Sequence, residues 1–174
     1  MDVMTRMVLI AAIGMFCLPA LALPNIGAQS PAFEVKDGDD RELDSASLKG
    51  KKLVIFYETR DDSVIEQNRA VKSMILEHLK QDPKLAAQTA IVPIIDCSSA
   101  FALTRSIWKS NLRANSEKEG LTIYCDWDGS VGRALQVQAN QSNVIVVGRD
   151  GLVKFAGGGV VKPSDVDRAL TDSP

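Results

Sequence analysis

Two cysteines, Cys97 and Cys125, carry the most distinctive chemistry of this chain once its apolar N-terminal segment is set aside. Their surroundings match, because each sulfur follows an apolar run and precedes polar residues, in "IIDCSS" and in "TIYCDW". Paired cysteines in an oxidising compartment form disulfides, and a thiolate at a helix N-terminus is reactive. Three interpretations follow: a structural disulfide, two unpaired thiols, or a redox-active pair with Cys97 as the attacking group.

A second group of polar residues lies where an apolar strand runs into a helix. Arg60, Asp61 and Asp62 directly precede the helical periodicity, and Glu66 follows one turn later. A carboxylate is stabilised by the N–H groups at a helix start, so the simplest interpretation is that Asp61 or Asp62, with Ser63, caps the helix. The alternative is that the four charged side chains form a site for a ligand or a hard cation. Because their spacing matches no metal-binding loop, we expect no metal ion or other cofactor.

Other candidate sites lack the residues that their chemistry needs. His78 is the single histidine, and its place among polar neighbours indicates a solvated helix face rather than part of a catalytic triad. The stretch 126–129 lacks the further oxygen ligands of a calcium loop and reads as a turn. The glycine-rich stretch 156–159 does not fit a phosphate-binding motif and reads as a sharp bend.

Composition excludes one class of partner. The chain has 174 residues, 45% of them hydrophobic, which suits one domain with its own core. Its formal net charge is -2 and no run of lysine and arginine occurs, so nucleic acid is not expected as a partner.

The first 22 residues have the composition of a secretory signal. Arg6 supplies the basic region, an apolar run follows, and Ala20 and Ala22 form the small-x-small pattern before a cleavage site. We expect residues 1–22 to be a signal peptide and residues 23–174 to be the exported domain, in the periplasm and with no membrane span after cleavage. The alternatives are a retained anchor or lipidation at Cys17, whose preceding residues lack the lipoprotein spacing.

The pattern of apolar residues predicts the first half of the fold. Residues 31–48 read as a strand or hairpin around Asp37-Gly38, and residues 51–58 as a buried strand in the middle of a sheet. Apolar residues at helical spacing predict one helix from Ser63 to about Lys80, with Ser63 and Glu66 as a capping box. Residues 89–96 read as a strand in which Pro93 favours an edge or a bulge.

The second half continues the alternation. Residues 98–120 predict a helix or a helix with a loop, 121–126 a short strand, and 131–137 a short helix. Two strands joined at Asp150-Gly151 occupy 143–158, and a terminal helix occupies 162–170. Strands alternating with helices, followed by a hairpin and a last helix, predict an α/β layer fold with a mixed sheet.

This order of elements, with "LVIFYETRDDSV" and "SNVIVVGRDGLVKFAGGG", resembles the thioredoxin fold as elaborated in peroxiredoxins and exported thiol oxidoreductases. In that resemblance Asp61 and Val64 occupy the positions of the two reactive cysteines. Ser142 occupies the position of the usual cis-proline, so an ordinary trans bond is expected there. The resemblance also implies that the strands ending at Cys97 and Cys125 are parallel neighbours, which favours the disulfide because it needs Cα atoms ~4.4–6.8 Å apart.

The chain is more particularly similar to the YtfJ-like family of periplasmic thioredoxin-fold proteins, over roughly residues 26–170. The similarity lies in Arg60 with the triplet Glu66-Gln67-Asn68, and in the stretch from Ser142 to the terminal helix. It implies a thioredoxin-like three-layer fold with a central mixed β-sheet flanked by helices, and a periplasmic location, rather than a particular reaction.

These observations lead to two functional hypotheses. The first is an exported, redox-inactive thioredoxin-fold protein that acts as a binding or accessory module, with a periplasmic protein or peptide as its partner. The second is a thiol-disulfide oxidoreductase or peroxidase that uses Cys97 and Cys125.

Overall fold

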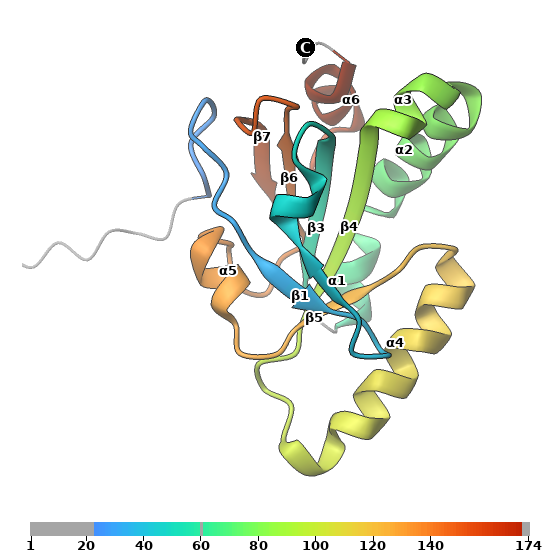
Figure 1. Ribbon diagram of the computed structural model, residues 1–174, viewed down its shortest axis with the longest axis vertical. Helices are drawn as coiled ribbons and strands as arrows, with labels where there is room; N and C mark the ends of the chain where they lie inside the picture. Colours follow the sequence, from blue (N-terminus) through green and yellow to red (C-terminus); the bar gives the residue numbers. More distant parts are fainter. Residues whose placement is uncertain (1–22, 60, 172–174) are drawn as a thin grey trace, which may run out of the picture.

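The strands form one seven-stranded mixed sheet in the part of the chain that the computed structural model describes, residues 23–59 and 61–171 (Figure 1). The strand order is β2-β1-β5-β4-β3-β6-β7. The strands are β1 (Glu34–Lys36), β2 (Glu42–Asp44), β3 (Lys52–Glu58), β4 (Thr89–Asp96), β5 (Tyr124–Asp126), β6 (Asn143–Val147) and β7 (Val153–Gly158). The predicted signal segment with Cys17, Ala20 and Ala22 lies outside the described residues, as does Arg60.

Helices cover both faces of the sheet and complete a three-layer, thioredoxin-like architecture. They are α1 (Asp62–Glu66), α2 (Arg69–Gln81), α3 (Pro83–Gln88), α4 (Arg105–Glu119), α5 (Ser130–Ala134) and α6 (Pro163–Thr171), with short 3₁₀ turns at Ser45–Leu48 and Ala102–Thr104. Val54 and Phe56 of β3 pack with α2 and α6, whereas Ile55 and Tyr57 pack with α5 on the opposite face. Figure 1 shows α5 on one side of the sheet and α2 with α3 on the other. The predicted fold class is therefore confirmed.

The run predicted as a buried strand is β3, and every one of its residues is buried. It pairs in parallel with β4 and antiparallel with β6, and the central position of the sheet belongs to β4. A strand covered on both faces needs a continuous apolar sequence, which is why this element was readable from the sequence.

Pro93 lies inside the sheet and not in an edge strand, which corrects the prediction. It pairs opposite Phe56 of β3, while the pairing of β4 with β5 begins only at Ile94. At Pro93 the strand therefore has a partner on one side only. A residue without a backbone N–H is tolerated at such a locally unpaired position.

The helix predicted from Ser63 to Lys80 is two helices, and the predicted capping box is wrong. Asn68, at φ -117° and ψ 23°, separates α1 from α2. The N-cap of α1 is Asp61, so Ser63 already lies inside the helix, and Glu66 forms an ion pair with Arg69. The short helix α3 was not predicted; Pro83 occupies its first turn and Asp82 caps it.

The bend predicted over 156–159 is wrong for most of that stretch, because residues 156–158 continue β7 and are paired with β6, and the chain turns only at Gly159, with φ 72°. The two hairpins and the helix within 98–120 are confirmed. The N-terminal hairpin is β1–β2, paired antiparallel, and the C-terminal hairpin is β6–β7 with Gly151 at φ 80° in its turn. The helix predicted within 98–120 is α4, which ends at Gly120 in the left-handed conformation that favours glycine. None of the helices in the described part of the chain is both long and apolar enough to cross a membrane.

Candidate functional site

The start of α1 carries a cap where the resemblance to thiol enzymes would place a nucleophile. The Asp61 carboxylate accepts hydrogen bonds from the Ser63 backbone N–H, at 2.8 Å, and from its hydroxyl, at 2.6 Å. These two hydrogen bonds hold the pKa of Asp61 below its usual value. Val64, which the same resemblance aligned with the second cysteine, is buried. The described residues contain no cluster of acidic, histidine or cysteine side chains arranged to hold a metal ion.

A buried polar network lies beside this loop, at the end of β3. The Glu58 side chain is only 1% exposed. One of its carboxylate oxygens accepts from the Ser142 hydroxyl at 2.8 Å, and the other accepts from the Lys72 ammonium at 2.8 Å. A buried charge is tolerated only when it is paired and hydrogen-bonded, and Glu58 has both kinds of contact.

Lys72 reaches this carboxylate from α2 and is itself largely buried, with 16% of its side chain exposed. Its ammonium also lies 5.1 Å from the centre of the Phe56 ring, a favourable cation–π position. Among the described residues Glu58 is its one hydrogen-bond acceptor. An ammonium group has three N–H donors, so two of them remain for water or a ligand.

Gln67 and Asn68 tie this network to two distant loops and explain the interruption between α1 and α2. The Gln67 side chain accepts from the Ser142 backbone N–H at 3.0 Å. The Asn68 amide donates to the Ser142 hydroxyl and to the Gly159 carbonyl, and it accepts from the Val161 N–H. Three satisfied contacts from one buried amide fix the backbone at Asn68 in a conformation that a continuous helix does not allow.

Ser142, which the resemblance to thiol enzymes aligned with the usual cis-proline, serves as the junction of the network. The described residues contain no cis peptide bond. The hydroxyl and backbone N–H of Ser142 contact Glu58, Asn68 and Gln67, so this loop is held by side-chain hydrogen bonds.

A cleft of about 570 Å³ opens next to the Glu58–Lys72 pair, between α2 and α4. Pro93 and Ile95 of β4 line it, as do Asp62 and Glu66 of α1. The cleft lies toward the carboxyl ends of β3 and β4, which is where open α/β sheets commonly bind ligands. Its volume is within the range of small-molecule and peptide pockets.

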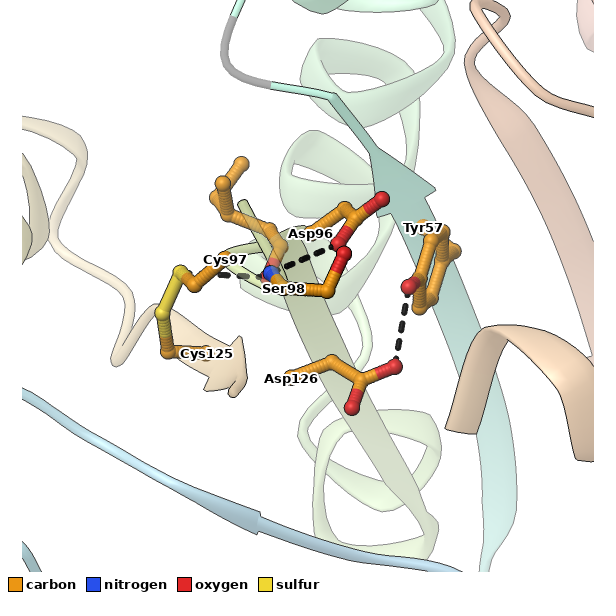
Figure 2. Close-up of a disulfide and its surroundings, with 7 residues drawn as sticks. Tyr57, Asp96, Cys97, Ser98, Cys125 and Asp126 are labelled. Carbon is orange, nitrogen blue, oxygen red and sulfur yellow. Dashed lines mark hydrogen bonds between the residues drawn. A yellow bond between two sulfur atoms is a disulfide. The ribbon is translucent and has the colours of Figure 1, made fainter. Parts of the chain in front are cut away.

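Cys97 and Cys125 are joined in a disulfide with a Cα–Cα distance of 5.8 Å (Figure 2). The parallel pairing of β4 and β5 places Ile95 opposite Cys125, as the resemblance implied, so both sulfurs lie at the same end of the two strands. The two cysteines are 0% and 1% exposed and pack against Leu112 of α4.

Asp126 follows Cys125 directly but faces the opposite side of the sheet. Its carboxylate accepts from the Tyr57 hydroxyl and from the Gly132 N–H, both at 2.9 Å. Burial raises the pKa of Asp126, and burial beside that carboxylate also raises the pKa of Tyr57. Figure 2 shows the carboxylate directed toward Tyr57 and away from the disulfide.

A comparison with protein families shows which family the chain belongs to. Residues 31–172 match the family described as "Bacterial protein of unknown function (YtfJ_HI0045)". The chain belongs to this YtfJ family. The match spans both the Glu66-Gln67-Asn68 triplet and the Ser142 loop, the two segments that the buried network joins. No curated protein sequence matches the chain.

Solved structures similar to this YtfJ-family chain share the thioredoxin fold at low sequence identity. A hypothetical protein, SMc02350 from Sinorhizobium meliloti 1021, has a TM-score of 0.65 and 15% identity, with 86% of each chain covered. The exposed lipoprotein thioredoxin Etrx1 from Streptococcus pneumoniae has a TM-score of 0.62 and 13% identity, covering 82% of this chain and 99% of that one. A secreted Mycobacterium tuberculosis disulfide oxidoreductase homologous to E. coli DsbE has a TM-score of 0.59 and 15% identity, covering 80% and 95%.

The structure unites only some of the residues singled out from the sequence. It brings Ser142 into the network, while Asp61 and Val64 serve the capping and packing of α1. Sequence reasoning missed Glu58 and Lys72. The available signal was Glu58 itself, an ionisable residue at the end of an otherwise apolar strand.

Proposed function

We propose that this YtfJ-family chain is an exported, redox-inactive thioredoxin-fold protein that works as a binding or accessory module in the periplasm. Export is supported by the signal-like residues 1–22 with the Ala20-x-Ala22 pattern, and by the secreted or exposed character stated for two fold relatives. The observation that carries redox inactivity is the start of α1. Asp61 and Val64 occupy this segment, at the positions where the resemblance to thiol enzymes implies the two cysteines.

The other two cysteines are poorly placed to substitute for the missing pair. Thiol–disulfide exchange requires a thiolate to approach a sulfur, and Cys97 and Cys125 are 0% and 1% exposed. The adjacent buried carboxyl, Asp126, is directed to the opposite face of the sheet and hydrogen-bonds Tyr57. These features support a structural role for the disulfide.

Thiol titration of the native protein tests this proposal against the oxidoreductase hypothesis. The full chain is expressed with its own N-terminal segment, purified from the periplasm, and incubated with a series of glutathione redox buffers. We expect the pair to remain oxidised in every buffer without denaturant, and to react only after unfolding. Ready reduction of the native protein, at a potential typical of catalytic disulfides, would support the oxidoreductase instead.

A further inference from the structure

The cleft between α2 and α4 combines an apolar interior with solvent-exposed side-chain amides. Its apolar lining comes from all sides: Ile65 of α1, Leu76 of α2, Pro93 and Ile95 of β4, Ile107, Trp108 and Leu112 of α4, and Ile123. A volume of about 570 Å³ exceeds that of one side chain. The interior therefore suits an apolar side chain together with part of the chain that carries it.

The charges that line the cleft largely neutralise one another. Lys72 pairs with Glu58, and Arg69 pairs with Glu66 and lies 3.8 Å from Glu119. Among the described residues, Lys118 and Asp62 are the lining charges without an ion-pair partner, and they have opposite signs. A strongly charged ligand would therefore find no region of opposite charge in the cleft, whereas an uncharged polar ligand would not be repelled by it.

Two asparagines contribute polar side chains to the cleft. Asn111 and Asn115 both line the cleft, one helical turn apart on α4, and both are exposed to solvent, with no hydrogen bond from either side-chain amide to another described residue. A carboxamide can donate to a peptide carbonyl and accept from a peptide N–H at the same time. Lys72, which also lines the cleft, adds N–H donors for a further carbonyl.

The spacing of the two asparagines matches an extended chain. Four residues along a helix advance by about 6 Å. Two residues along a β-strand, which return the backbone amide to the same side, advance by about 6.6 Å. Consecutive amides on one side of an extended peptide can therefore meet Asn111 and Asn115 in succession.

We propose that the α2–α4 cleft binds an extended peptide segment, with one apolar side chain in the interior and its backbone amides paired with Asn111 and Asn115. The inference rests on the proposed binding function and names its partner class and site. An apolar carboxylic acid could fill the apolar interior but has no backbone amides to pair with Asn111 and Asn115, so it serves as the comparison ligand.

The test is an NMR titration of the isotope-labelled full chain. The side-chain amide signals of Asn111 and Asn115 are identified by their loss in the two alanine variants. The probes are acetylated and amidated Ala-Ala-Leu-Ala-Ala, the same peptide with serine in place of leucine, its backbone N-methylated form, and octanoate. We expect the leucine peptide to shift both signals saturably, and the serine and N-methylated peptides to bind about 10-fold more weakly.

Variants complete the experiment. Asn111→Ala with Asn115→Ala should weaken the leucine peptide about 10-fold, whereas Ser110→Ala, on the same helix but outside the cleft, should leave its affinity unchanged. No saturable shift, equal binding of the N-methylated form, or binding of octanoate alone would each overturn the inference. Redox turnover is measured separately, so failure here is distinguishable from failure of the proposed redox inactivity.

Discussion

The Ser142 hydroxyl donates a hydrogen bond of 2.8 Å to the buried carboxylate of Glu58, and so joins the loop before β6 to the end of β3. The same hydroxyl accepts from Asn68 at 2.9 Å. One oxygen therefore connects three segments that are distant in sequence: the end of β3, the start of α2 and the loop before β6.

Removing that oxygen should be costly. Ser142→Ala leaves an oxygen of Glu58 and a donor of Asn68 unsatisfied in a buried place, so we expect a loss of about 1–3 kcal/mol in the free energy of unfolding. Urea denaturation measures it. The exposed Ser110→Ala should change stability by less than about 0.5 kcal/mol, and an equal effect of the two substitutions would contradict the network.

Lys72 should matter more because it neutralises Glu58. Lys72→Met leaves an unpaired carboxylate that is 1% exposed, and we expect a loss of about 3–5 kcal/mol. Lys80→Met, an exposed change on the same helix, is the matched control and should be nearly neutral. Adding Glu58→Gln to Lys72→Met should restore most of the lost stability; a double variant that is as unstable as the sum of the singles would refute the coupling.

The raised pKa of Asp126 should make the stability of the protein depend on pH. Burial raises the pKa of this carboxyl in the folded protein above its value of 3.8 in the unfolded chain. The contribution of Asp126 to the free energy of unfolding is therefore fully present below pH 3.8, and it is lost as the pH rises through the pKa of the folded protein. We expect Asp126→Asn, which keeps an acceptor for Tyr57, to gain stability relative to the native protein as pH rises from acid to neutral. A difference that stays constant with pH would show that the pKa of Asp126 is not raised.

The disulfide should act as a staple. It closes a separation of 28 residues, and removing it through Cys97→Ala with Cys125→Ala should lower the free energy of unfolding by roughly 3 kcal/mol. Denaturation of the native protein with and without reductant provides the comparison, since the reduced protein should unfold at nearly the midpoint of the double variant. Identical denaturation midpoints for the oxidised and the reduced protein would contradict a structural role for the disulfide.

Much of the fold was predictable because short stretches of sequence indicate its individual elements. The run 51–58 is apolar throughout because β3 is buried on both faces, and Asp150-Gly151 marks the β6–β7 turn by its own conformational preference. The disulfide followed from a resemblance that placed the two strands side by side, and the pairing of Ile95 with Cys125 bears this out.

The site was less predictable because its contacts are long-range. Apolar spacing continues across Gln67 and Asn68, so periodicity indicated one helix. The interruption depends on hydrogen bonds to Ser142, Gly159 and Val161, which the local sequence does not encode. The cleft depends in turn on where α4 packs against the sheet, and a helix pattern specifies an apolar face but not its partner.

The most direct test of the central claim is a turnover assay of the purified protein, expressed with its own N-terminal segment, with insulin and with hydroperoxide as substrates and a dithiol as reductant. The absence of sulfur from the start of α1 predicts rates no higher than in buffer, with the protein and its Cys97→Ser variant indistinguishable. Turnover at an enzymatic rate that disappears in Cys97→Ser would contradict the account.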